Sequence, residues 1–322
     1  MRQECFLVTG CAGFIGRHIL RRLLADGHSV RGIDDFSTSD RKTRKELPRN
    51  FEFIEGSLCD PEKAAAAISG IDRVIHLASI PSVPRSLENP RESAMSSVIG
   101  TVTLLDAAAR SGVRRIVQAS SSSVYGDSPV LPRIESDSPR PLSPYAAAKL
   151  AQEQYASVFA KCRGLDSVSL RYFNVFGPGQ NPNGPYAAVV PKFIRLMAGG
   201  KRPEIYGDGN QTRDFTHVDD VAAATIGASL VSRPLRGETI NIGSGKGRSL
   251  NELATCLNEI LGTCLEPVYA RPRPGDVRNS LADIAKAERL LGYLPSVPFR
   301  EGLERTVASM FGKKGKSGKF SV

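Results

Sequence analysis

The sequence predicts an α/β fold in which a doubly wound parallel sheet is joined to a smaller, mixed α/β lobe. Short apolar runs rich in β-branched residues alternate with stretches of helical length through the first half of the 322 residues. A glycine-rich turn follows the first apolar run, and the regular alternation ends near Tyr172. Such alternation favours parallel strands covered by helices on both faces, and these sheets bind ligands at the carboxyl ends of their strands.

Six strands are expected before Tyr172, each a short apolar run bounded by polar or turn-forming residues. They are Phe6–Thr9, Ser29–Ile33, Phe51–Glu55, Arg73–Leu77, Arg115–Ala119 and Ser167–Arg171. Four helices are expected between them, and glycines at 112 and 164 mark the ends of the last two. These helices are Phe14–Asp26, Pro61–Ser69, Ser93–Ser111 and Tyr145–Cys162.

The composition changes after Tyr172, which predicts a second unit. The loop at 177–185 and the segment at 271–276 are rich in Gly, Pro and Asn or Arg, and the elements between them are short. We expect a nucleotide-binding domain at 1–172, to which 214–242 also belongs. The smaller lobe then takes 173–213 and 243–312, and 313–322 forms a disordered basic tail.

Charge and composition exclude several classes of protein. The net charge is +10, but four of the 43 basic residues lie in the last ten positions, so we expect an anionic small-molecule substrate and no nucleic acid. No apolar run approaches the roughly 20 residues that span a membrane, which predicts no membrane insertion. The chain enters its first strand without a signal peptide, so we expect a cytoplasmic protein. Six scattered cysteines without a CxxC pair, and four histidines, predict free thiols and no metal site.

The segment LVTGCAGFIG at 7–16 has the features of a dinucleotide site. Gly10, Gly13 and Gly16 stand between a predicted strand and a predicted helix, where glycine lets the backbone turn tightly and approach a pyrophosphate. Asp34 ends the second strand, where a carboxylate accepts hydrogen bonds from ribose hydroxyls and repels a 2′-phosphate. A plain turn and a turn-capping Asp are the alternatives. Together the two features predict a Rossmann-type domain that binds NAD rather than NADP.

A second group of residues suggests proton transfer. Tyr145 and Lys149 lie four apart, on one face of a predicted helix that begins near Pro144. An ammonium beside a phenol lowers the pKa of the phenol, which lets the tyrosine act as a base. The serine run at 120–123 follows the fifth strand, where polar side chains line the crevice or form a polar loop.

These features, in this order and spacing, resemble the extended short-chain dehydrogenase/reductases over almost the whole chain, from Phe6 to about Met310. Within that family the chain resembles the UDP-sugar 4-epimerases. The stretches that carry this second resemblance are DDFSTS (34–39), HLAS (76–79), SVPRS (82–86), SSSSVYGD (120–127), LRYFNVFGPGQ (170–180), YGDGNQTRDF (206–215), NIGSG (241–245) and GDVRNSLAD (275–283).

The resemblance implies a catalytic triad of Ser121, Tyr145 and Lys149 that oxidises the sugar transiently at carbon 4, with NAD as the hydride acceptor. The implied cofactor-binding residues are Gly10, Gly13, Phe14, Ile15, Gly16, Asp34, Ser57, Leu58, Leu77, Ala78, Ser97, Tyr145, Lys149 and Phe173. The implied substrate-binding residues are Ser121, Ser122, Ser123, Tyr145, Asn174, Val189, Tyr206, Arg213, Arg273, Arg278 and Ser280. Ser57 and Ser97 depart from the Asp and Asn that are usual in the family, which predicts weaker retention of NAD.

The same resemblance implies a substrate and an assembly. Ser280 occupies a position where a small residue admits a 2-acetamido group and a tyrosine excludes it, which predicts interconversion of UDP-N-acetylglucosamine and UDP-N-acetylgalactosamine, with UDP-glucose and UDP-galactose slower. The helices at 93–111 and 145–162 are implied to form a homodimer interface.

Three other functions stay open at this stage. A UDP-glucuronate 4-epimerase is compatible with the serine run and the basic residues. A nucleotide-sugar 4,6-dehydratase needs an Asp–Glu pair where this chain has Ser122 and Ser123. A non-catalytic NAD-binding regulator usually lacks the Tyr or the Lys, and this chain has both.

Overall fold

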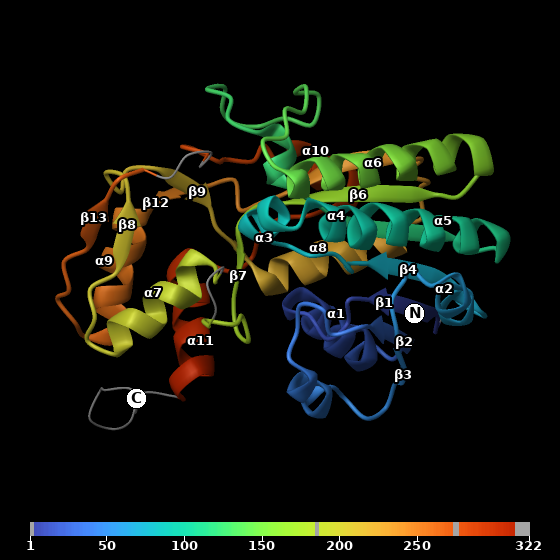
Figure 1. The fold of residues 1–322 in the computed structure, drawn as a ribbon, viewed down its shortest axis with the longest axis horizontal. Coiled ribbons are helices and arrows are strands. Elements are labelled where there is room, and N and C mark those ends of the chain that lie inside the picture. The colour runs from blue at the N-terminus through green and yellow to red at the C-terminus, as the bar shows by residue number, and fades with distance from the viewer. Residues whose placement is uncertain (1–2, 184–186, 273–276, 313–322) are drawn as a thin grey trace.

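A seven-stranded parallel sheet forms the larger part of the computed structural model, which describes residues 3–183, 187–272 and 277–312 (Figure 1). The strand order is β11-β6-β5-β4-β1-β2-β3, so the chain starts in the middle and winds outward in both directions. The strands are β1 (Cys5–Thr9), β2 (Ser29–Asp34), β3 (Glu52–Glu55), β4 (Arg73–His76), β5 (Arg115–Ser121), β6 (Ser167–Tyr172) and β11 (Glu238–Ile242). The predicted α/β doubly wound fold is confirmed.

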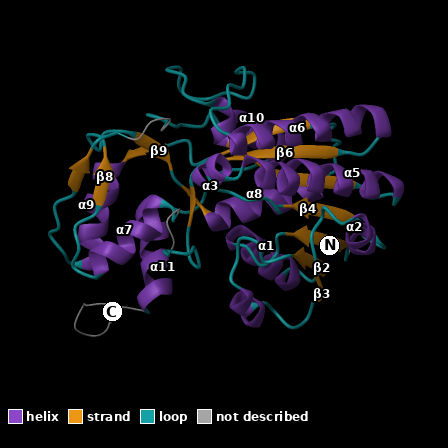
Figure 2. Cartoon of the chain, viewed as in Figure 1, coloured by secondary structure: helices purple, strands orange, loops and turns teal. Residues whose placement is uncertain are grey.

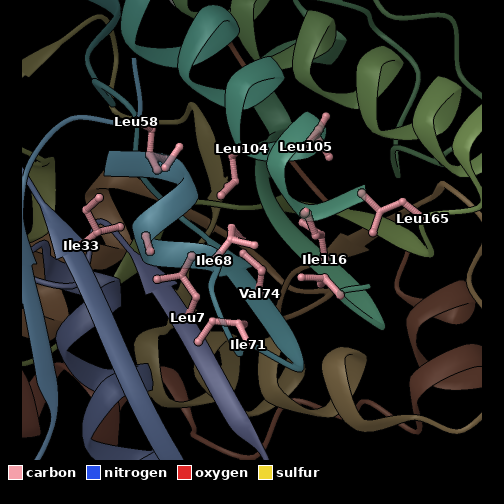
Figure 3. Packing of buried hydrophobic residues seen from close by; sticks show 14 residues of the cluster. Leu7, Ile33, Leu58, Ile68, Ile71, Val74, Leu104, Leu105, Ile116 and Leu165 are labelled. Carbon is pink, nitrogen blue, oxygen red and sulfur yellow. The ribbon is translucent and has the colours of Figure 1, made fainter. Parts of the chain in front are cut away.

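Helices cover both faces of this sheet, because successive side chains of a strand point to opposite faces. In β1, Leu7 packs in the apolar cluster of α2 (Pro61–Ile68) and α5 (Gly100–Arg110), as Figure 3 shows. Phe6 and Val8 pack instead with α1 (Phe14–Ala25) and α8 (Val218–Leu230). The long helix α6 (Pro144–Arg163) lies beside α5 on the first face. Burial of both faces explains the continuous apolar run Phe6–Val8 in β1, whereas β3, at the edge of the sheet, begins and ends with an exposed glutamate.

The six predicted strands all occur, with ends that differ by one or two residues, and β11 is a seventh that was not predicted individually. The predicted single helix Ser93–Ser111 is wrong in detail: it consists of α4 (Pro90–Ala94), a π-helical turn η2 (Met95–Ile99) and α5. The Ser97 carbonyl within this turn accepts hydrogen bonds from the Thr101 hydroxyl and from Gln152 of α6. The bond from Gln152 is a tertiary contact, so the spacing of apolar residues in the sequence does not predict the π-helical turn.

The segments after β6, apart from α8, β11 and α10 (Ala285–Leu291), build a smaller region at one end of the sheet (Figure 2). Its apolar cluster joins α7 (Val189–Ala198), α9 (Leu250–Leu261) and α11 (Phe299–Phe311). Three two-stranded sheets accompany it: β7 (Val175–Phe176) with β10 (Thr216–His217), β8 (Glu204–Tyr206) with β13 (Val268–Ala270), and β9 (Thr212–Asp214) with β12 (Gly247–Ser249). The helix α10 returns to pack beside β11.

The parallel arrangement gathers four strand ends at one edge of the sheet. The glycine turn follows β1, the HLAS segment begins in β4, the serine run ends β5 and Asn174 follows β6. Polar residues far apart in the sequence therefore meet at this edge. Among the described residues, no helix is long and apolar enough to cross a membrane.

Candidate active site

The glycine turn after β1 is built by close backbone packing. Gly10 has a left-handed φ of +66°, and a Cβ on it would lie 2.9 Å from the amide nitrogen of Ala78. A Cβ on Gly16 would lie 2.2 Å from the carbonyl oxygen of Gly10. Gly13 caps α1 without a side-chain hydrogen bond, and residues 13–16 all line the cleft, so the first turn of α1 leaves its free N–H groups to a ligand. These features form a cradle for a pyrophosphate.

Asp34 joins the end of β2 to this cradle. Its Oδ2 accepts a hydrogen bond from the Ala12 amide at 2.9 Å, and its Oδ1 accepts one from the Phe36 amide at 2.9 Å. Burial raises the pKa of the Asp34 carboxyl, while the two amide donors oppose that rise. Asp34 lines the same cleft as the glycines, so its carboxylate stands beside the cradle at the point where a dinucleotide presents its ribose hydroxyls.

One cleft of about 1360 Å³ extends from the cradle along the sheet edge into the smaller region. Its size suits a dinucleotide together with a nucleotide sugar. Most of the predicted site residues line it, including the whole triad. They are Gly10, Gly13, Phe14, Ile15, Gly16, Asp34, Ser57, Leu58, Leu77, Ala78, Ser121, Ser122, Ser123, Tyr145, Lys149, Asn174, Arg213 and Ser280.

The first turns of α6 position Tyr145 and Lys149. Ser143 caps the helix through the Ala146 amide at 3.2 Å, and Pro144 occupies the first turn. The Tyr145 amide, one of the free donors of that turn, reaches the Ser86 hydroxyl at 3.1 Å. Tyr145 and Lys149 then lie one turn apart on the face that lines the cleft.

The electrostatic environments of the two side chains differ. Burial lowers the pKa of Lys149 to about 7, and the Glu153 charge opposes this shift. The Lys149 Nζ donates a hydrogen bond to the Ala119 carbonyl at 2.8 Å. Burial raises the pKa of Tyr145, and a hydrogen bond with the Ser121 side chain opposes the rise. The Ser121 Oγ also accepts the Ser123 amide at 3.1 Å, which orients it.

Asn174, Arg213 and Ser280 form the far end of the cleft. Asn174 has a φ of +25°, and its buried Oδ1 has no hydrogen-bond partner among the described residues. The Arg213 Nη1 donates to the carbonyls of Thr212 and Arg278, each at 2.9 Å. The Ser280 amide donates to the Thr212 carbonyl at 3.1 Å, which holds its small side chain against the cleft. An unsatisfied amide oxygen suits a hydrogen-bond donor on a ligand, such as a hydroxyl, and a guanidinium suits an anionic group.

Five predicted contacts do not line the cleft, and a sixth, Arg273, lies outside the described residues. Ser97 is fully buried in the π-helical turn, and Phe173 is fully buried against Tyr125. Arg278 is exposed and paired with Asp208 at 3.0 Å. The others are Tyr206, whose hydroxyl bonds Glu204, and Val189, which begins α7 next to the cleft residue Ala188.

Sequence reasoning missed several polar side chains that line the cleft. Arg17 follows Gly16 directly; its Nη2 donates to the Gly179 carbonyl at 2.8 Å, and its Nη1 pairs with Glu46 at 2.6 Å. Arg85, in the SVPRS stretch, pairs with Glu92 at 2.7 Å. Arg17 directly follows the glycine turn, which is a local signal, whereas Arg85 lies inside α3 (Val83–Glu88) and reaches the cleft through the packing of that helix. Others in this group are Gln180, Asn181, Asn183 and Arg195.

The site therefore combines a pyrophosphate cradle, a ribose-binding carboxylate and a Ser–Tyr–Lys group in one cleft, and comparison with known proteins agrees. Residues 6–243 match the NAD dependent epimerase/dehydratase family. The chain is 40% identical, over 94% of its length and 96% of the relative, to a UDP-glucose 4-epimerase of Mycolicibacterium smegmatis.

Two solved structures have the same fold with a TM-score of 0.90 each. The UDP-glucose 4-epimerase of Thermotoga maritima with UDP-glucose is 39% identical, over 95% of this chain and 98% of that one. The UDP-N-acetylglucosamine 4-epimerase of Methanobrevibacter ruminantium, in complex with UDP-N-acetylmuramic acid, is 36% identical, over 96% and 99%. The chain belongs to the NAD-dependent epimerase/dehydratase family, and its cofactor is NAD.

Proposed function

We propose that this chain, an NAD-dependent UDP-sugar 4-epimerase and therefore an isomerase, interconverts UDP-N-acetylglucosamine and UDP-N-acetylgalactosamine, and acts more slowly on UDP-glucose and UDP-galactose. The observation that carries the choice of sugar is Ser280. It lines the cleft that Tyr145 also lines, and it is 9% exposed. A serine at this wall leaves room for a 2-acetamido group, whereas a tyrosine fills that room.

The roles of the triad follow from the local chemistry. Tyr145 takes the proton of the sugar 4-hydroxyl and returns it at the end of the cycle. Ser121 bonds the Tyr145 side chain and orients the hydroxyl that reacts. Lys149 lies one turn away on the face that lines the cleft, and its ammonium stabilises the Tyr145 phenolate that forms in the reaction. NAD bound in the cradle supplies the hydride chemistry at carbon 4.

The remaining assignments are part of this proposal. Asn174 and Arg213 hold the substrate diphosphate, and Arg278 adds positive charge nearby. Arg273, which lies outside the described residues, keeps its predicted role as a substrate contact. Val189 and Tyr206 contact the nucleotide, and Ser122 and Ser123 contact the sugar. Phe173 and Ser97 are buried and do not line the cleft, so in this proposal they support the residues that contact the cofactor rather than contacting it themselves.

We also propose the domain division at 1–172 with 214–242, and at 173–213 with 243–312. Two observations support it: β11 pairs with β6 in the main sheet, and α7, α9 and α11 share an apolar cluster of their own.

A homodimer is proposed through the face formed by η2, α5 and α6. Met95, Ile99, Tyr155 and Val158 are exposed on these helices. Apolar side chains gathered on neighbouring helices favour a helical interface around a two-fold axis. Light scattering should give twice the mass of one chain, and a monomer at micromolar concentration would contradict this assembly.

A UDP-glucuronate 4-epimerase is the second candidate. Arg85 and Arg195 line the cleft, and a guanidinium suits the carboxylate of a uronate. The pairing of Arg85 with Glu92 and the bond from Arg195 to Asn183 reduce their availability, so we rank this substrate second. A 4,6-dehydratase is less well supported, because Ser122 and Ser123 supply neither the acid nor the base.

The deciding experiment incubates the purified protein separately with UDP-N-acetylglucosamine, UDP-glucose and UDP-glucuronate, and follows the anomeric protons by NMR. We expect fastest conversion of the N-acetylated sugar. Conversion of glucuronate alone would overturn the substrate and keep the reaction. No conversion of any sugar, with NAD supplied, would overturn the function in favour of a non-catalytic NAD-binding protein.

Tyr145→Phe should lower kcat on every accepted sugar by about 10²–10⁴, because the proton acceptor is lost while the ring remains. Tyr269→Phe is the matched control, since Tyr269 is exposed on β13 and does not line the cleft. Substantial activity in Tyr145→Phe would remove Tyr145 from the role of base.

A further inference from the structure

A buried ion pair lies directly behind the catalytic face of α6. The Arg171 Nε and Nη2 donate to the two Glu153 carboxylate oxygens at 2.9 and 2.7 Å. The two side chains are only 4% and 3% exposed. Neither residue lines the cleft. Two charges withdrawn from water at this depth are expensive unless their geometry is good and their other hydrogen bonds are satisfied.

The surroundings of the pair satisfy most of these requirements. The Ser120 hydroxyl donates to the Glu153 Oε1 at 2.5 Å. The Arg171 guanidinium lies over the Tyr125 ring, 4.6 Å from its centre, and the Tyr125 hydroxyl donates to Asn241 at 2.6 Å. The group therefore connects α6 with the neighbouring strands β5, β6 and β11.

Two members of this group, Glu153 and Ser120, are each one step from a triad residue. Glu153 is one helical turn after Lys149. Ser120 stands between Ala119, whose carbonyl holds the Lys149 ammonium, and Ser121, which bonds Tyr145. In the β5–β6 register, Ser120 lies opposite Arg171. A shift of the ion pair would therefore move Lys149 and Ser121 relative to each other.

We propose that Glu153 and Arg171 are positioning residues for the epimerase reaction: as an ion pair they lock α6 to the ends of β5 and β6, and they place a negative charge one turn behind the Lys149 ammonium. This inference rests on the catalytic role proposed above for Lys149.

The charges around Lys149 give the inference a pH signature. Two titratable groups act on Lys149 in the structure: Glu153 from α6 and His76 from β4. Burial lowers the pKa of His76 to about 3, so His76 is neutral near pH 7. Arg171, from β6, acts through Glu153. Glu153 thus supplies the negative charge that opposes the lowering of the Lys149 pKa to about 7. Without that charge, the ammonium loses its proton at a lower pH.

The test uses the holoenzyme saturated with NAD and measures kcat and KM from about pH 5.5 to about pH 9, a range that brackets the Lys149 pKa of about 7. Glu153→Gln keeps the shape and removes the charge. We expect kcat to fall roughly ten- to hundredfold at neutral pH, with KM almost unchanged, because the misplacement affects the reacting groups rather than substrate binding. The basic limb of the kcat profile should also move to lower pH.

Two further variants separate geometry from stability. Arg171→Lys retains a positive charge without the bidentate geometry, and should recover part of the activity lost in an Arg171→Met variant. Glu153→Leu combined with Arg171→Met removes both charges at similar volume, which commonly preserves folding. This double variant should melt cooperatively and still show the loss of kcat, and it decides the matter if Glu153→Gln does not fold.

Asp166→Asn provides the matched control. Asp166 pairs with Arg115 at 2.7 Å near the opposite ends of β5 and β6, away from the cleft. It should lower the melting temperature without changing kcat or the pH profile.

The inference is overturned if folded Glu153→Gln and the folded double variant both keep the wild-type kcat and pH profile, or if only KM changes. Failure of the proposed function looks different: the wild-type protein would then convert no sugar at all. If only the role of Lys149 were wrong, Lys149→Met would keep wild-type activity. Loss of activity in Lys149→Met, together with unchanged ion-pair variants, would overturn the positioning role alone.

Discussion

The two ends of the cleft are built in different ways. The cofactor end comes mainly from one continuous stretch, residues 7–34, in which Gly16 packs on Gly10 and Asp34 bonds the Ala12 amide. The sugar end brings together Asn174, Arg213 and Ser280, from three segments separated by tens of residues. Backbone geometry dominates at the first end and side-chain size and charge at the second. A change at the cofactor end should therefore affect all substrates equally, whereas a change at the sugar end should discriminate between them.

The largest effect is expected for Gly16→Ala. The new Cβ would lie 2.2 Å from the Gly10 carbonyl, and backbone on both sides cannot yield without opening the turn. NAD retention and activity on every sugar should be lost together, with destabilisation of on the order of 3 kcal/mol or more. Bound NAD is measured by absorbance after denaturation, and stability by thermal unfolding.

Gly227→Ala is the matched control for that change. Gly227 lies inside α8 with open space around its Cβ position, so the alanine should stabilise the protein by about 0.5–1 kcal/mol. Tight NAD binding by Gly16→Ala would mean that close packing of the turn is not what forms the cofactor end.

Ser280→Tyr should give an intermediate, selective effect. The larger side chain should reduce kcat/KM for UDP-N-acetylglucosamine by roughly 10–200-fold and leave UDP-glucose nearly unchanged, as expected when a pocket loses room for a small group. Ser280→Ala should retain both activities. Equal losses of kcat/KM for the two sugars would contradict the proposal that this end of the cleft discriminates between substituents at carbon 2.

Arg278→Ala should have the smallest effect. Its guanidinium is exposed and already paired with Asp208, and exposed pairs contribute about 0–1 kcal/mol. We expect less than a fivefold rise in KM for either sugar and no change in kcat. A larger rise in KM would show that Arg278 turns toward the diphosphate when substrate binds. Arg278 would then belong to the sugar end, although it does not line the cleft in this structure.

The contrast between the two ends also explains what could be predicted from the sequence. The glycine turn, Asp34 and the Tyr145–Lys149 pair are local patterns whose spacing fixes their geometry, and the structure brings all of them into one cleft. Arg17 and Arg85 were missed because their proximity to the cleft depends on where α1 and α3 (Val83–Glu88) pack. The burial of Phe173 and the π-helical turn around Ser97 likewise depend on tertiary contacts, which the spacing of apolar residues along the sequence does not predict.

The bonds from α1 to the loop after β7 have a thermodynamic consequence. Arg17 holds the Gly179 carbonyl, and His18 of the same helix contacts the Pro178 carbonyl at 2.8 Å. The helix whose first turn faces the cofactor therefore also restrains a loop whose next residues, Gln180 and Asn181, line the cleft. If a ligand displaces this loop when it binds, binding of NAD and binding of the sugar nucleotide are linked. Such linkage is reciprocal: the factor by which bound NAD changes the affinity for the sugar nucleotide equals the factor by which the bound sugar nucleotide changes the affinity for NAD.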